Sequence, residues 1–237
     1  MRSFTSSCFV LVLLITLIMP AYASVQIRAT IGEVVHVVFN FGNVTNYEEI
    51  KGVITELTIP EAVVSSLKER NLTDVKYSLE SLDFDDAEKA MTASFSLSGS
   101  DIVELTFSTE TMRREFRVRT DWRKFELNLT ESVSLNFTRY FDVPVSLWEY
   151  ENATYPTYYY NYTGTVPFDP TCYFILPKDA TEVHVEEMET IVFELPPSLG
   201  ESLVNSPFLI LGGILVAIIV ASVYRTARKS EKGGWES

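Results

Sequence analysis

The chain has 237 residues, 46% of them hydrophobic, and a formal net charge of −13. Setting aside the single cation near the N-terminus and the net two positive charges after Tyr224 leaves −16 for residues 24–206. An excess of this size repels phosphate backbones and anionic headgroups, which argues against nucleic acid or an anionic lipid surface as a partner of this segment.

The first 23 residues have the pattern of a secretory signal peptide. Arg2 is followed by an apolar run from Cys8 to Met19, and then by Pro20 and the triplet Ala21-Tyr22-Ala23. Small residues three and one positions before a bond are what signal peptidase requires, so we expect a signal peptide at 1–23 that is cleaved after Ala23. An uncleaved N-terminal anchor is the alternative.

Alternation of apolar and polar residues with a period of two dominates the next hundred residues. It predicts β-strands, with a bulge near Ser81 where the phase of the alternation slips. The predicted strands are 35–41, 53–59, 75–84, 91–97, 103–107 and 116–118. One helix is expected at Pro60–Arg70, where Val63, Val64 and Leu67 form an apolar face and Asn71 suits the C-terminal end.

The strand that contains Arg113, Arg117 and Arg119 is unusually basic. On a strand these three side chains share a face, so they are candidates for docking an acidic partner or an anionic wall polymer. The alternative, which we favour, is pairing with carboxylates on neighbouring strands.

Residues 125–129 and 133–137 alternate again and predict a hairpin that turns near Glu131, with aliphatic side chains on one face and Asn128 and Asn136 on the other. Residues 143–170 are aromatic and rich in proline, which indicates a long connection with short edge strands. Within it, Tyr158, Tyr159 and Tyr160 are candidates for stacking on sugars or for a protein interface, or they cover a sheet edge. Further strands are expected at 172–176, 182–186 and 190–195.

Residues 24–206 contain one cysteine, Cys172, which excludes a disulfide bond within this segment. Exported animal domains commonly carry disulfides, so the composition is closer to that of archaeal envelope proteins. We expect Cys172 to be a buried and inert thiol rather than an intermolecular bridge.

Pro207–Tyr224 contains no charged residue. A helix of this length covers about 27 Å, close to the roughly 30 Å of a bilayer core. The residues that follow are basic, which is typical of the cytoplasmic side: Arg225, Arg228, Lys229 and Lys232. The pattern predicts a transmembrane helix at 207–224 that contacts the lipid bilayer, and a cytoplasmic tail at 225–237. A glycolipid-anchor signal is the alternative, although its apolar tail should end the chain.

Small residues recur every four positions in this predicted span, at Gly213, Ala217 and Ala221. Such a stripe lets two helix backbones approach closely, which would favour a homo-oligomer. The ordinary glycine and alanine content of a membrane helix is the alternative.

Between the two apolar ends lie six N-x-Thr triplets, where the nine Asn and 22 Thr of the chain would give about 0.8 by chance. Their acceptor residues are Asn43, Asn71, Asn128, Asn136, Asn152 and Asn161. Glycan transfer occurs outside the cytoplasm, so we expect residues 24–206 to be extracellular and N-glycosylated.

No pattern of catalytic or metal-binding residues stands out. The only histidines are His36 and His184, and neither lies in a zinc or catalytic motif. The acidic turn around Asp83, Asp85, Asp86 and Glu88 could hold Ca²⁺, but it lacks the spacing of a calcium loop, and a solvated turn is favoured. We therefore expect no cofactor, no metal and no enzymatic activity.

The sequence predicts a mainly β, sandwich-like ectodomain with one short helix, divided near Thr120 into β-rich parts at 24–120 and 121–206. It predicts a single-pass type I membrane glycoprotein at the cell surface, with a non-enzymatic structural or interaction role and a protein or glycan partner outside the cell. The alternative is an accessory subunit of a multi-span complex for transport, secretion or glycosylation.

Overall fold

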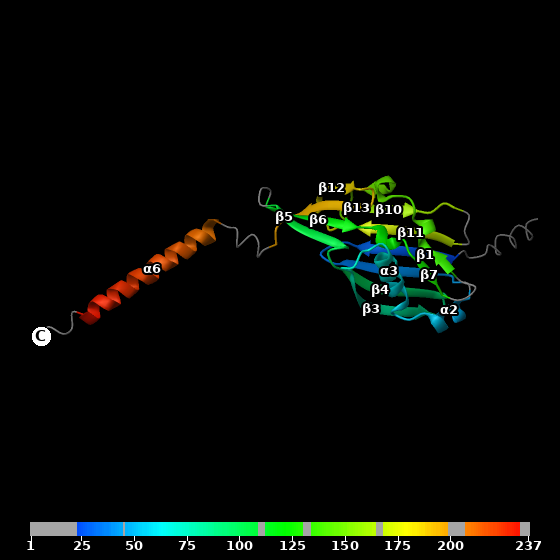
Figure 1. Ribbon diagram of the computed structural model, residues 1–237, viewed down its shortest axis with the longest axis horizontal. Coiled ribbons are helices and arrows are strands. Elements are labelled where there is room, and N and C mark those ends of the chain that lie inside the picture. The colour runs from blue at the N-terminus through cyan, green and yellow to red at the C-terminus, as the bar shows by residue number, and fades with distance from the viewer. Residues whose placement is uncertain are drawn as a thin grey trace, which may run out of the picture. The chain divides into compact units, whose positions relative to one another are not determined.

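The computed structural model describes residues 23–44, 46–108, 112–129, 134–164, 168–198 and 207–232. The predicted signal peptide therefore lies outside the described residues except for Ala23. The described chain is mainly β, as predicted, and its strands form three sheets (Figure 1). The chain divides into two compact units, Met1–Phe107 with Glu115–Leu195, and Ser108–Arg114 with Pro196–Ser237.

The largest sheet has seven strands. In order across the sheet they are β3 (Lys76–Asp85), β4 (Ala90–Ser98), β2 (Val35–Gly42), β1 (Ala23–Thr30), β11 (Phe168–Ile175), β10 (Thr157–Asn161) and β9 (Glu149–Glu151). Neighbouring strands are antiparallel except β1 and β11, which run parallel, with Ile27 opposite Cys172. Segments from the two ends of the domain thus lie at the centre of one sheet.

The alternation read from the sequence becomes an inner and an outer face of this sheet. Val35, Val37, Phe39 and Phe41 of β2 are all buried, and the residues between them are half-buried or exposed. The same holds for β4, where the apolar side chains from Met91 to Leu97 face inward. Apolar burial stabilises by about 25 cal/mol per Å², so a strand of this pattern is held in one register.

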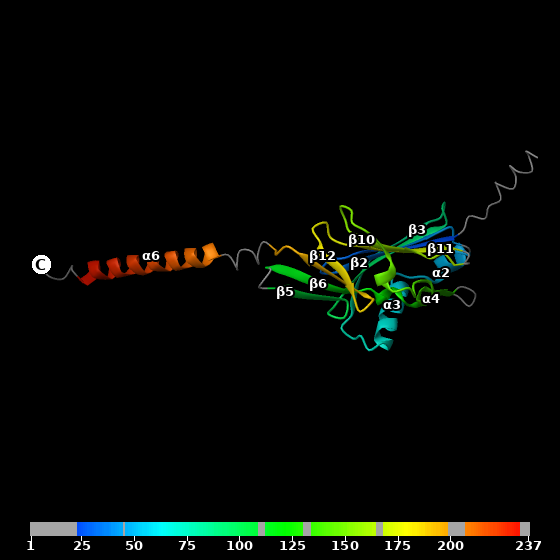
Figure 2. The ribbon, with the colours of Figure 1, turned by 90° about the horizontal axis from the view of Figure 1, so that it is seen from above.

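The inner face is covered by helix α3 (Thr58–Glu69), the hairpin β7 (Glu126–Asn128) and β8 (Ser134–Asn136), helix α4 (Phe137–Tyr140) and the short helix η1 (Asp121–Arg123) (Figure 2). Phe39 lies edge-on to Phe125 at 5.8 Å and to Phe137 at 5.9 Å between ring centroids. Trp122 of η1 lies perpendicular to Phe174 of β11 at 5.8 Å. The contacts of Phe39 join the elements after Thr120 to β2, and the contact of Trp122 joins η1 to β11.

A four-stranded sheet follows the order β12 (Thr181–Glu186), β13 (Thr190–Leu195), β6 (Arg113–Arg119) and β5 (Val103–Ser108). Phe116 of β6 stacks on Phe193 of β13 at 5.1 Å, and both side chains are fully buried. Strands were predicted at all four places, and β6 begins three residues earlier than its predicted start at Phe116.

Helix α3 confirms the predicted helix. Val63, Val64 and Leu67 are buried, and the helix ends in a left-handed residue, Asn71, with φ of 65°. The Asn71 N–H donates to the Lys68 carbonyl at 3.0 Å and the Leu72 N–H to the Leu67 carbonyl at 3.1 Å, which is the hydrogen-bond pattern of a Schellman motif.

The predicted strand at 53–59 is wrong. In the structure, helix α2 (Tyr47–Val53) ends at the start of this segment, residues 54–57 form a connection, and α3 begins at Thr58. Val53 and Leu57, two of the alternating apolar residues, are exposed, while Ile50 and Ile54, four positions apart, are buried. Acidic residues in a first turn, here Glu48 and Glu49, favour a helix. Ile50 and Ile54 have the four-residue spacing of a helix, and their burial shows that this spacing, rather than the two-residue alternation, sets the local structure.

Other predictions are confirmed with differences at the ends of elements. The bulge in β3 lies between Leu79 and Ser81, and the hairpin β7–β8 pairs Leu127 with Leu135, although its turn lies outside the described residues. The second hairpin strand ends one residue early because Asn136 caps helix α4 by accepting the Arg139 N–H at 2.8 Å. In the predicted connection, the short helix η2 (Val145–Leu147) precedes β9, which is an edge strand as expected, and β10, which lies inside the sheet.

Helix α6 (Pro207–Lys232) contains the predicted span and runs on into the predicted tail. In the described part of the chain, no helix is both long and apolar enough to cross a membrane. The span at 207–224 therefore stays a prediction.

Candidate functional site

A groove of about 370 Å³ lies on the outer face of the seven-stranded sheet, which we call the outer-face groove. Its lining residues are Arg28, Glu151, Tyr155, Thr157, Tyr159, Tyr173 and Ile175. They come from β1, β11, β10, β9 and the connection between β9 and β10. Side chains alternate between the faces of a strand, so these residues point away from the core.

A row of planar side chains crosses four strands beside this groove. Arg28 is opposite Tyr173, Tyr173 is opposite Tyr159, and Tyr159 is opposite Glu149. The Arg28 guanidinium lies 5.5 Å from the centre of the Tyr173 ring, and the two tyrosine rings stack at 6.1 Å. The Tyr159 hydroxyl donates to the Glu149 carboxylate. This hydrogen bond, with a smaller contribution from burial, raises the pKa of Tyr159.

The three candidate tyrosines from the sequence do not act together. Tyr158 is buried in the inner face, and Tyr160 stacks on Trp148 at 5.5 Å toward the core. Only Tyr159 faces the groove. Arg28 and Tyr173 were missed, although Val25, Ile27 and Ala29 alternate in β1 and would have placed Arg28 on the opposite face.

The candidate arginines on β6 are engaged within the domain. Arg117 donates to Glu186 of β12 at 2.6 Å and lies within 3.8 Å of both Glu104 and Glu115. Arg119 lies 3.4 Å from Asp121, and Arg113 is half-buried with an interaction of its own. Cross-strand pairing, the favoured alternative, therefore describes Arg117.

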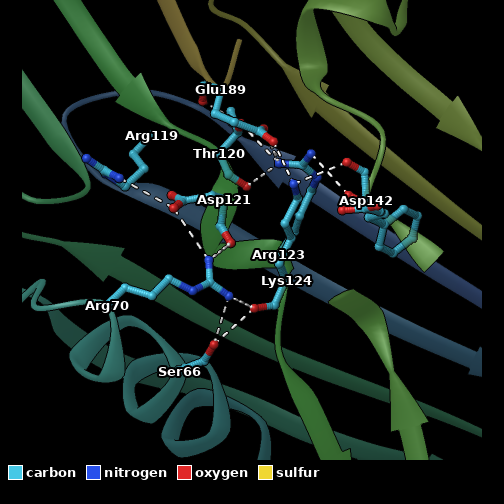
Figure 3. Close-up of polar contacts among 10 residues, drawn as sticks. Ser66, Arg70, Arg119, Thr120, Asp121, Arg123, Lys124, Asp142 and Glu189 are labelled. Carbon is cyan, nitrogen blue, oxygen red and sulfur yellow. Dashed lines mark hydrogen bonds and ion pairs between the residues drawn. The ribbon is translucent and has the colours of Figure 1, made fainter. Parts of the chain in front are cut away.

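The most enclosed charge of the basic segment is Arg123, whose side chain is fully buried (Figure 3). One guanidinium nitrogen donates to Glu189 at 2.8 Å and to the Thr120 carbonyl at 2.9 Å. The other donates to the Phe141 carbonyl at 3.2 Å and to the Val143 carbonyl at 3.0 Å. The guanidinium also lies 4.8 Å from the Trp148 ring.

Glu189 receives a second cation, because Lys124 Nζ lies 2.7 Å from its other oxygen. Burial alone would raise the pKa of Glu189, but the hydrogen bonds and charges of Arg123 and Lys124 outweigh it and hold this pKa below its usual value. Beside this pair, Arg70 of α3 reaches the Asp121 carbonyl at 3.0 Å and the Ser66 hydroxyl at 3.0 Å (Figure 3). The network ties η1 to α3, α4 and the turn before β13, so its role is structural.

Ser96, His36 and Glu80 meet on the outer face, away from the groove. The Ser96 hydroxyl lies 3.0 Å from His36 Nδ1, Glu80 lies 2.8 Å from the same nitrogen, and the hydroxyl also donates to Glu80. A nucleophilic serine needs its hydroxyl and the acid on opposite ring nitrogens, so that the imidazole accepts the serine proton. Here both contact one nitrogen, so this trio lacks that geometry.

The acidic turn is held by contacts of its own. Asp86 accepts from Lys51 at 2.5 Å and from Tyr47 at 2.6 Å, and both bonds lower the pKa of Asp86. Asp85 accepts from the Ala87 N–H at 2.9 Å. Within the described ranges, no group of three or more His, Cys, Asp or Glu residues is placed to hold a metal ion.

Five of the six sequon asparagines have exposed side chains. They are Asn43, Asn71, Asn128, Asn152 and Asn161. The sixth, Asn136, is half-buried; its amide nitrogen donates to Glu126 and its oxygen caps α4. Thr45 and Thr130 of the triplets lie outside the described residues.

The small-residue stripe of α6 is open. Gly213, Ala217 and Ala221 are exposed, and a Cβ added at Gly213 would meet nothing within 4 Å. The side chains of the predicted basic tail, residues 225–237, are not among those that the structure describes.

Comparison with known proteins found no matching protein-family model, no matching curated protein and no matching solved structure.

Proposed function

We propose that this chain is a single-pass membrane glycoprotein whose β-rich domain is displayed outside the cell, with α6 as the anchor and a non-enzymatic role at the surface or envelope. The six sequons carry the proposal, because they are many more than chance gives and all lie between the two apolar ends.

The positions of the sequons support this orientation. A glycan is bulky and hydrophilic, so its acceptor must reach solvent. Five of the acceptor side chains are exposed, and the sixth is half-buried at the end of a short strand.

The exposed apolar side chains of α6 support an anchoring role. Seven apolar side chains of α6 are each at least 52% exposed: Leu211, Ile214, Leu215, Val216, Ile218, Ile219 and Val220. An apolar helix surface of this kind must be covered, and the absence of charge from 207 to 224 fits hydrocarbon as the cover.

Protease treatment of intact cells tests the orientation. The full chain carrying a C-terminal epitope should lose its β domain to added protease, while the epitope stays protected until the membrane is permeabilised. Protection of the domain in intact cells would contradict the proposal.

Removal of single sequons tests glycosylation. Thr73→Ala, Thr154→Ala and Thr163→Ala remove acceptor motifs without changing the asparagine, and each should lower the apparent mass by one glycan. Exposed threonines elsewhere, such as Thr55, provide matched controls that should leave the mass unchanged. A domain whose mass never responds to these changes or to glycosidase carries no glycans.

An accessory subunit remains the second candidate because the small-residue stripe of α6 is exposed and suits close helix packing. Purification in mild detergent separates the two roles. Stoichiometric recovery of a multi-span protein, lost in Gly213→Leu, would favour the subunit; recovery of the chain alone or with surface polymer would favour the surface role.

A further inference from the structure

We propose that the outer-face groove binds a neutral saccharide chain supplied from outside this polypeptide. The inference deepens the proposed function and rests on it for the presence of such polymers around the domain. The groove itself is argued from side chains that the structure describes.

Two opposite charges in this groove have no charged partner. Within the described residues, the Arg28 guanidinium lies over the Tyr173 ring and forms no ion pair, and the Glu151 carboxylate forms no ion pair and acts on Tyr159 only through its charge. A guanidinium offers only donors and a carboxylate only acceptors. A ligand that satisfies both must present acceptors and donors together, as the hydroxyls of a sugar do.

The rest of the lining suits the same ligand. Tyr155, which is 55% exposed, offers an apolar ring and a hydroxyl, and Ile175 adds an aliphatic surface. The Tyr159 hydroxyl donates to Glu149, so it can still accept a hydrogen bond from a ligand. Tyrosine is well matched to a ligand with apolar C–H surfaces and a polar rim. The groove volume of about 370 Å³ lies in the range of small-ligand sites rather than of a folded partner.

Charge selects a neutral chain. The lining holds one cation and one anion, whereas residues 24–206 as a whole carry −16. That field repels an anionic polymer, and a cationic one would bind the many carboxylates elsewhere on the surface. A neutral saccharide depends only on the local groups.

The two sequons nearest the groove lie at its ends and not in its lining. Asn161 is on the outer face of β10, next along that face to the lining residue Tyr159. Asn152 follows Glu151 at the rim, after the end of β9. Both sites therefore flank the groove.

The test uses the full chain in detergent and a panel of neutral hexasaccharides of glucose, mannose, galactose and N-acetylglucosamine, with calorimetry and tyrosine fluorescence as readouts. At least one probe should bind. Arg28→Gln and Glu151→Gln should each weaken binding about tenfold or more, the value of one hydrogen bond to a charged group. Both side chains are exposed, so the melting temperature should not change.

Lys178→Gln and Glu56→Gln remove the same two charge types at exposed positions elsewhere and should leave binding intact.

A Thr154→Ala/Thr163→Ala variant separates the two sources of sugar, because it removes the flanking glycans. Absence of binding by both this variant and the parent, or binding that ignores Arg28 and Glu151, would overturn the proposal. Binding that appears only in the variant would assign the groove to the chain's own glycans instead. Each of these results is independent of protease accessibility in cells, so the groove and the orientation can fail separately.

Discussion

At the residue scale, Arg123 is the charge on which the interior depends. Its guanidinium is fully buried and is matched by Glu189 and by three backbone carbonyls. Removing one member of such a pair strands the other in a low dielectric, which costs far more than the pair itself contributes.

We therefore expect Arg123→Met to lower the free energy of unfolding by about 3–5 kcal/mol. The matched control is Arg119→Met, at the end of β6 and four residues before Arg123. It should cost about 1 kcal/mol or less because Arg119 is 39% exposed. Chemical denaturation followed by tryptophan fluorescence measures both. Similar losses for the two variants would remove the special role of Arg123.

The same pair makes stability depend on pH. The pKa of Glu189 is lower in the folded chain than its usual value of 4.5, so the unfolded state binds more protons below that value. Its contribution is complete above about 4.5 and is lost as pH falls through the lowered folded pKa.

Glu189→Gln should therefore be less stable than the parent at pH 7, and the difference should shrink as pH falls below about 4.5. Denaturation curves for both proteins between pH 3 and 7 measure it. A difference that stays constant over this range would mean that the carboxylate charge has no stabilising role.

At the element scale, the structural role of Asn71 can be separated from its proposed glycosylation. Asn71 ends α3 in the left-handed region and it is a sequon acceptor. Glycine adopts this conformation freely, whereas alanine costs about 1 kcal/mol or more there.

Asn71→Gly should thus remove the glycan with little loss of stability, while Asn71→Ala should remove the glycan and lower the melting temperature by several degrees. Differential scanning calorimetry compares them, with Thr73→Ala as the control that removes the glycan alone. If the glycine and alanine variants melted together, the end of α3 would not depend on this conformation.

Gly99 closes the turn between β4 and β5 with φ of 115°, and a Cβ there would lie 2.0 Å from the Asp74 carbonyl oxygen. Gly99→Ala should cost about 2 kcal/mol or more, because backbone must move. Gly52→Ala, in helix α2 with nothing within 4 Å, should instead gain about 0.5–1 kcal/mol. Urea midpoints for the pair test this, and a Gly99→Ala protein as stable as the parent would contradict it.

Single strands could be predicted from sequence where one face is buried, as in β2 and β4, because burial imposes the alternation directly. Residues 53–59 misled because Val53 and Leu57 alternate but are exposed. The parallel pairing of β1 with β11 has no local signal. The outer-face groove was found only in part for the same reason: Arg28, Tyr173 and Tyr159 become neighbours through cross-strand register, and only Tyr159 stood in a segment that the sequence singled out.

At the scale of the whole molecule, the reactivity of the Cys172 thiol measures how often the large sheet opens. Its side chain is fully buried at the centre of the large sheet, as predicted, and burial raises its thiol pKa to about 12 against the opposing influence of Arg123. The thiolate is the reactive form, so both access and charge state protect it.

In a Cys8→Ser background, Cys172 should react with a thiol reagent at least about a thousandfold more slowly in the folded chain than in denaturant, since labelling then requires opening of the sheet. Ellman's reagent measures both rates. Rapid labelling under native conditions would mean that β11 opens locally.

The parallel pairing of β1 with β11 also determines when the large sheet can be completed during synthesis. The ribosome makes β1 first, and it makes the parallel partner β11 only after most of the other strands. Until then the central strands are an unfinished edge, with unpaired amides ready to join the wrong neighbour. The exposed edge of β1 must therefore be protected from mispairing during synthesis. The yield of folded protein should depend on how fast the final third of the chain is translated.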